Sequence, residues 1–390
     1  MTIVVEAGDL ARRSPLVRVP FGPGPVPAAV RDTDSGQVLP VQADPLTGEG
    51  VFIAVGDLSA GQSRSYQETD EPATAAHPAS AVVKLDRVVL QVGGARFADY
   101  LVAGGRRPYF WPVVSSTGAS VVRGQGSADH PHHTGLAISY GGHSEAGATN
   151  IWSDWDEPPY GPGGRMVHRG FRRVTTGAVY GEIVQDLTYL TSDGDAFADE
   201  VRTIRWWFSD DDQRFLDFHS EVSRVADHTN GPFLLMARTP EAMDVPETGR
   251  VTNSADAATP ERVYRVEDRY HAAWTDASGP SGGLPPAAPS GPPEDLPDLR
   301  DDAARYRSVG DGPWHGISVL DHPDNDGFPN VVGKYAMVQQ ITQAHYAPAE
   351  APQGPFSFRT RVLVHAGDAD RARLADVAAD YARPSAVRRD

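Results

Sequence analysis

The stretch EIVQDLTYLTSDGDAFADEVRTIRWWFSDDDQRFLDFHSEVSRV, residues 182–225, decides the fold. It contains three runs rich in β-branched and aromatic residues, and the short polar segments SDGD and SDDDQ separate them. Segments of that composition are typical of tight turns between antiparallel strands. Because no helical pattern alternates with the runs, a parallel α/β sheet is disfavoured. We therefore predict consecutive antiparallel strands.

The third run shows how such a strand is placed. Side chains alternate between the two faces of a strand, which puts Leu216, Phe218 and Val222 on one face and Asp217, His219 and Glu221 on the other. One interpretation is a half-buried strand with its polar face in water. The other is a polar concave face that binds a hydroxyl-rich ligand.

The same signals extend outward along the chain. Residues 1–75 contain short strand-like runs broken by Pro, Gly and Asp, which predict a small N-terminal β module of immunoglobulin-like type. Residues 82–368 are predicted to form a large antiparallel β-sandwich. A Pro/Gly-rich insertion at 277–313 interrupts it, and we expect no strand of a central sheet there. Residues 369–390 are predicted to be a C-terminal helix and tail.

The C-terminal helix is predicted from DADRARLADVAADYA, residues 368–382. Leu374, Val377, Ala378 and Tyr381 share one face at helical spacing, and Pro384 ends the segment. The fold class is therefore all-β, a large sandwich preceded by a small β module and followed by a short helix.

Composition narrows the function classes. The chain has 390 residues, a net charge of −17 and no cysteine. The acidic balance disfavours nucleic acid as a partner, and the absence of thiols excludes disulfides, thiolate nucleophiles and Cys-ligated metals. No apolar run approaches the roughly 18 residues that span a bilayer, and the N-terminus does not resemble a signal peptide. We expect a cytoplasmic protein with no membrane partner.

A histidine cluster stands out in ADHPHHTGL, residues 128–136. In an extended segment, His130 and His132 point to one face and His133 to the other. Paired imidazoles on one face are a common start of a divalent-metal site, with Asp129 placed to orient a ring. Proton transfer by the imidazoles and a surface loop without function are the alternatives, and spacing alone does not separate the three.

Several segments resemble a bacterial family commonly labelled PmoA family, or methane oxygenase-like. The segments are RRPYFWPVVSSTGASVVR, ADHPHHTGLAISYG, NIWSDW, MVHRGF, RVTNSAD, AAWTDASGP, ISVLDHPDN and FSFRTRVLVHAGD. Together they cover about residues 100–368. An oxygenase subunit of that kind is expected in a membrane, so we regard the label as a misnomer. The resemblance implies a role in sugar catabolism and a sandwich similar to galactose mutarotase. The insertion at 277–313 and the few aromatic residues after ISVLDHPDN depart from the family pattern.

The candidate site residues follow from the cluster and from these segments. The predicted catalytic residues are His132, His133, His168 and His322. The predicted substrate-binding residues are Arg107, Tyr109, Trp111, Asp129, Trp152, Asp321 and Asn325. The metal ligands, if a divalent ion binds, are His130 and His132; no other cofactor is expected.

The leading functional hypothesis is an enzyme that cleaves a C–O bond of a glycoside or keto-glycoside, as a hydrolase or a lyase. Imidazole suits such acid–base chemistry because its pKa lies near neutrality. Three alternatives stay open. They are an aldose epimerase of the mutarotase type, in which His133 works with a carboxylate such as Glu221, a sugar-binding protein without chemistry, and a metal-dependent oxygenase. For the cleavage enzyme, the epimerase and the sugar-binding protein, the expected partner is a small carbohydrate.

Overall fold

Two large antiparallel sheets form the body of the protein. The computed structural model describes residues 1–22, 24–116, 118–124, 133–140, 149–154, 163–210, 213–224, 233–240, 243, 249–255, 270–280, 312–329, 331–335, 340–344 and 355–390. The first sheet has nine strands in the order β10 (Ala79–Val83), β11 (Arg87–Val92), β12 (Ala95–Leu101), β13 (Tyr109–Val113), β14 (Leu136–Tyr140), β19 (Phe233–Arg238), β25 (Gln340–Ala344), β24 (Val331–Tyr335) and β21 (Tyr270–His271). The second has eight, in the order β15 (Arg165–Thr175), β16 (Tyr180–Leu190), β17 (Ala196–Asp210), β18 (Gln213–Arg224), β26 (Phe356–Ala366), β23 (Trp314–Asp321), β22 (Trp274–Pro280) and β20 (Arg250–Asn253). The predicted all-β antiparallel architecture is confirmed.

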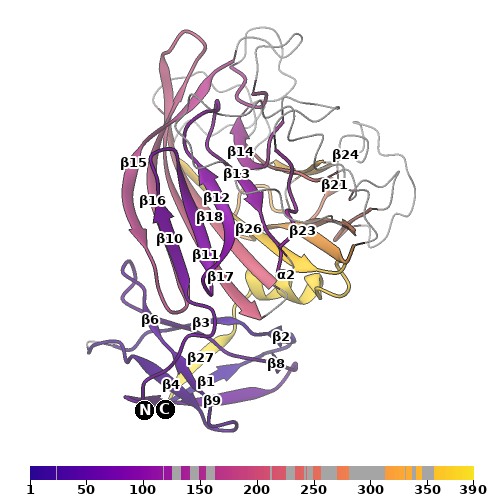
Figure 1. Ribbon diagram of the computed structural model, residues 1–390. Coiled ribbons are helices and arrows are strands. Elements are labelled where there is room, and N and C mark those ends of the chain that lie inside the picture. The colour runs from indigo at the N-terminus through magenta and orange to yellow at the C-terminus, as the bar shows by residue number, and fades with distance from the viewer. Residues whose placement is uncertain are drawn as a thin grey trace.

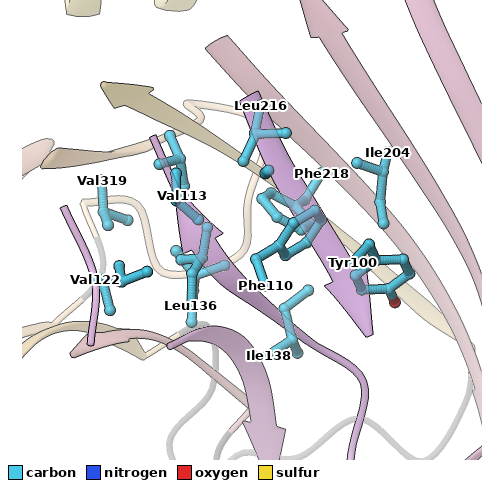
Figure 2. Close-up of a cluster of buried hydrophobic side chains, with 14 of the residues drawn as sticks. Tyr100, Phe110, Val113, Val122, Leu136, Ile138, Ile204, Leu216, Phe218 and Val319 are labelled. Atoms are coloured by element: carbon cyan, nitrogen blue, oxygen red, sulfur yellow. The ribbon is translucent and has the colours of Figure 1, made fainter. Parts of the chain in front are cut away.

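The main hydrophobic core lies between these two sheets (Figure 2). Phe110 of β13 stacks on Tyr100 of β12, with ring centroids 4.5 Å apart, and meets Phe218 of β18 edge-on at 5.8 Å. Leu216, Phe218 and Val222 all point into this core, as the alternation predicts. Burying the inward side of each strand is what holds the sheets together.

The N-terminal residues form a separate small module below the sandwich (Figure 1). Its strands make three sheets: β27 (Ala386–Arg389), β1 (Thr2–Glu6), β9 (Ser63–Thr69), β4 (Ala29–Asp32) and β5 (Val38–Pro40) in one; β3 (Leu16–Val19), β7 (Gly50–Ile53) and β6 (Gln42–Ala43) in the next; and β2 (Arg12–Arg13) with β8 (Asp57–Leu58) in the last. They enclose a core of their own. The last strand of the chain thus pairs with the first, which the sequence did not indicate.

Polar contacts fix the module to the outward face of the eight-stranded sheet. The Gln42 side chain accepts hydrogen bonds from the backbone N–H groups of Val179 and Tyr180 and donates one to the Tyr180 carbonyl. Arg205 of β17 pairs with Asp44 of the module at 3.0 Å and with Glu182 at 2.6 Å. The module therefore covers part of the outward face of this sheet.

The helix α2 (Leu374–Ala382) covers another part of the same face. Leu374, Val377 and Tyr381 are its buried residues, which confirms the predicted apolar face. It begins later than residue 368, because Arg373 adopts a left-handed conformation with φ of 50° and the preceding residues form turns. No helix of the described residues is long and apolar enough to cross a membrane.

One expectation about the insertion is wrong. β22 continues to Pro280 and pairs with β23, so residues 277–280 belong to the eight-stranded sheet. The small side chains of Ala277, Ser278 and Gly279 allow this pairing, and Pro280 stands at the end of the strand, where proline is tolerated. Residues 281–311 of the insertion lie outside the described residues.

Removing β27 tests how strongly the last strand supports the module. A chain that ends at Pro384 makes β1 an edge strand and loses the pairing of Ile3 to Glu6 with residues 386–389. At roughly 0.5–1.5 kcal/mol per hydrogen bond, we expect a loss of about 2–4 kcal/mol from the stability of the module. Hydrogen exchange of the β1 amides measures it. Arg388→Ala, which changes an exposed side chain and keeps the backbone pairing, is the control. Unchanged protection of β1 in the truncated chain would contradict the prediction.

Candidate functional site

The end of the histidine cluster lies at the start of β14, in the nine-stranded sheet. His133, Thr134 and Gly135 are described and lead into Leu136, the first residue of the strand. Asp129, His130 and His132 lie outside the described residues, so their predicted roles are not addressed by the structure. His133 is therefore the member of the cluster from which a site can be built.

Gly135 fixes the path of the chain just after His133. Its φ is +58°, and a Cβ placed on it would lie 2.2 Å from the Phe110 carbonyl oxygen. Its N–H donates to the Arg123 carbonyl at 2.9 Å, and its carbonyl accepts from the Arg238 N–H at 2.8 Å. Only glycine combines that backbone conformation with so close an approach.

His133 is buried, with 4% of its surface exposed. Its ring meets the Trp152 indole edge-on, with centroids 5.0 Å apart and planes at 82°. Asn150 holds this tryptophan in place, since its Oδ1 accepts the Trp152 backbone N–H at 2.7 Å. Two residues predicted to act in the site, His133 and Trp152, are thus brought into contact.

A buried ion pair stands beside them. Arg107 Nη1 donates to Asp154 Oδ1 at 3.0 Å and to the Ile151 carbonyl at 3.0 Å. The Thr134 hydroxyl donates to Asp154 Oδ2 at 2.7 Å. The two charged side chains are 1% and 4% exposed, so the pair sits in a medium where charges interact strongly. Asp154 joins the histidine segment to the segment of Trp152.

Tyr109 and Trp111 occupy the outward face of the same sheet. They pack with Leu101 and Ala137, and Trp111 also touches the edge of the main core. Burial and then the Asp154 charge raise the pKa of the Tyr109 phenol, so the hydroxyl stays protonated at neutral pH. A Cβ on Gly124 would lie 2.9 Å from the Trp111 ring, so glycine lets the backbone pass close to the indole. The site therefore combines a buried charge pair, an imidazole and aromatic surfaces.

His168 lies on the other sheet. It is in β15, and its ring packs on Phe171 of the same strand with centroids 4.3 Å apart. The start of β15 touches the arginine segment through one backbone bond, from the Met166 N–H to the Arg106 carbonyl. Among the described residues, no hydrogen bond or ring contact joins His168 to His133.

His322, Asp321 and Asn325 form a cluster of their own after β23. Asn325 Nδ2 donates to Asp321 Oδ1 at 2.6 Å and to the Arg359 carbonyl at 2.7 Å, while its Oδ1 accepts the Arg359 N–H at 2.7 Å. The His322 ring packs on Tyr381 of α2, with centroids 4.9 Å apart. These bonds fasten the loop to β26 and to the helix, on the outward side of the eight-stranded sheet.

The structure shows functional candidates that the sequence analysis missed. Asp154 and Thr134 are the two that join the site, and the aspartate of NIWSDW was the available signal. A second buried group involves Asp276, whose Oδ1 accepts from the Ser318 hydroxyl at 2.7 Å and lies 2.9 Å from His365 Nε2. Because the serine bonds the carboxylate and not the imidazole, this is not the arrangement that activates a serine nucleophile.

No metal centre is visible in the part of the chain that is described. Nowhere among those residues do three or more His, Asp or Glu side chains gather closely enough to hold an ion. The two predicted ligands, His130 and His132, lie outside that part.

One buried and three half-buried histidines make the stability of the protein depend on pH. Burial lowers the pKa of His168, His219, His315 and His322 from the ordinary value of 6.5. Below about pH 6.5 these histidines bind protons in the unfolded chain but are still neutral in the folded protein. The stability that these groups contribute is therefore fully present above pH 6.5 and is lost as the pH falls through the window down to the lowered values.

Urea titrations at several pH values measure this effect. We expect these histidines to leave the urea concentration at half-unfolding unchanged between pH 7.5 and 8.5. As the pH falls from 6.5 to 5, that concentration should decrease. In His315→Gln the fall should be shallower, because a side chain that is fully enclosed no longer titrates. An identical slope in the variant would contradict the assignment to His315.

The fold and the site define a class: an all-β sandwich protein with an enclosed polar site beside β13 and β14 of its nine-stranded sheet. Residues 87–379 match the family described as "Family of unknown function (DUF6807)", and the chain belongs to that family. Comparison with the curated proteins gave no match. The matched range begins at β11 and ends inside α2, so it contains the whole candidate site and leaves out the N-terminal module.

Proposed function

We propose that the protein is a carbohydrate-active enzyme that cleaves a C–O bond of a glycoside or keto-glycoside, with His133 as the acid–base group. The observation that carries the proposal is the contact of the buried His133 ring with the Trp152 indole, beside the buried Arg107–Asp154 pair. An indole offers a flat apolar surface to the C–H face of a sugar, and enclosed polar groups bind its hydroxyls.

The chemistry needs a group that removes a proton and returns one. On a 3-keto-glycoside, a neutral imidazole takes the proton from C2, the electron pair forms the C1–C2 double bond, and the C1–O bond breaks. The leaving oxygen then receives a proton from the imidazolium. Water added across the double bond gives the hydrolysis product, so the same site supports a lyase or a hydrolase. Exclusion of bulk water from a buried site favours this use of a weak base.

The test is a kinetic comparison of wild type with His133→Gln on glycosides and 3-keto-glycosides, followed by NMR. We expect His133→Gln to lose about 100- to 10,000-fold in kcat/KM, the usual contribution of a general acid–base group. His271→Gln, which changes an exposed histidine on β21, should keep the wild-type rate. Circular dichroism and retained sugar binding show that the variant is folded.

The products decide between the alternatives. Release of the aglycone supports cleavage, whereas exchange of anomers without release would replace the proposal with an epimerase. Binding of sugars with no turnover by wild type would replace it with a binding protein. Equal rates for His133→Gln and wild type would remove His133 from the mechanism.

A further inference from the structure

One edge of the Arg107 guanidinium donates to no residue in the part of the chain that the structure describes. Its Nη1 makes both of the bonds described above, whereas its buried Nε and Nη2 atoms donate to no group of the described chain. The whole residue is 2% exposed, so bulk water does not solvate these donors. A buried donor without an acceptor is costly, and a guanidinium more so, which points to a partner that arrives from outside.

The geometry of that edge selects the partner. Nε–H and Nη2–H lie parallel in the guanidinium plane, along one edge of the group, and match the two oxygens of a carboxylate. Neutral hydroxyls and a single keto oxygen use only one of the two donors well.

We infer that Arg107 is the receptor for the carboxylate of an acidic sugar, so that the substrate class is a uronic-acid glycoside or a related sugar acid. Asp154 holds the guanidinium by Nη1 and so turns the Nε/Nη2 edge toward the ligand. This inference rests on the proposed function for the reaction, but not for the binding.

Binding of matched sugars to the full chain tests it by calorimetry. The probes are methyl β-glucuronide, its neutral counterpart methyl β-glucoside, and glucose 6-phosphate. We expect the glucuronide to bind about 10- to 100-fold more tightly than the glucoside, as for hydrogen bonds to a charged group. Arg107→Lys should remove most of that preference, because it keeps the charge beside Asp154 and loses the parallel donors. Arg172→Lys, an exposed residue on the other sheet, should keep it.

Each outcome is decisive. Equal affinity of wild type for glucuronide and glucoside overturns the inference, and this measurement does not depend on whether Arg107→Lys folds. Tighter binding of the phosphate than of the glucuronide overturns the assignment to a carboxylate. If Arg107→Lys still prefers the glucuronide over the glucoside, Arg107 does not bind the carboxylate and the inference is overturned. If the protein cleaves neutral glycosides and shows no preference for acidic ones, this inference is overturned and the proposed function stands. If the protein binds the glucuronide through Arg107 but does not turn it over, this inference stands and the proposed function is overturned.

Discussion

Arg202→Met is expected to lower the free energy of unfolding by about 3–5 kcal/mol, because it leaves a carboxylate buried without its countercharge. Arg202 and Glu200 lie side by side on the inward face of β17. Nε and Nη2 of the arginine donate to the two carboxylate oxygens at 2.7 and 2.8 Å, and both side chains are at most 1% exposed. The Tyr189 hydroxyl donates to the same carboxylate at 2.5 Å, and burial with the Glu200 charge raises the pKa of this tyrosine well above its usual value.

Two further variants make the result interpretable. Arg172→Met breaks an ion pair with Asp186 whose members are 55% and 40% exposed, and should cost little stability because solvent screens exposed charges. The double variant Glu200→Leu/Arg202→Met removes both charges and should recover most of the loss, as apolar replacements of buried pairs often do. Urea denaturation of the three proteins gives the values. If the double variant is as unstable as Arg202→Met, the cost is one of packing and not of an uncompensated charge.

Gly135→Ala is expected to be the most damaging change near the candidate site. The substitution adds the strain of a positive φ, about 1–2 kcal/mol, to a clash of 2.2 Å with a backbone carbonyl that cannot move without shifting β13. We expect a loss of more than about 3 kcal/mol. We also expect the substitution to displace His133, two residues away. The variant should then lose kcat/KM on glycosides and 3-keto-glycosides, as His133→Gln does.

Two other glycines separate the causes. Gly8 has a φ of +66° with open space around it, so Gly8→Ala measures the conformational cost alone. Gly170 meets neither restriction, so Gly170→Ala should be nearly neutral. Thermal unfolding of the three variants tests this order. If Gly135→Ala loses no more stability than Gly8→Ala, the backbone at the start of β14 can shift enough to relieve the clash with the Phe110 carbonyl.

The sequence predicted the fold class well because its signals are local. The alternation through Leu216 and Phe218 depends only on the two-residue period of a strand, and it placed both side chains in the core. The face of α2 followed from the helical period in the same way. The pairing of β27 with β1 could not be predicted, since it joins residues almost 390 positions apart and carries no local pattern.

Only part of the candidate site could be predicted from the sequence, because contacts between distant segments leave no local pattern. His133 and Trp152 were selected from separate segments, and the structure puts them in contact. Asp154 was passed over although it is two residues from Trp152, because an isolated aspartate in a sequence gives no sign that it will face a buried arginine. His322 and Asn325 were selected from the segment ISVLDHPDN; here Asn325 bonds to Arg359 of β26, and the His322 ring packs on Tyr381 of α2.

The pairing of β27 with β1 has a consequence for how the N-terminal module folds during synthesis. About 380 residues separate the two strands, so β1 has an open edge until β27 has left the ribosome. At a synthesis rate of roughly 5–20 residues per second, this interval lasts on the order of 20–80 s. The strands of the sandwich lie between β1 and β27 in the chain, so the sandwich can form before β27 completes the sheet of the module.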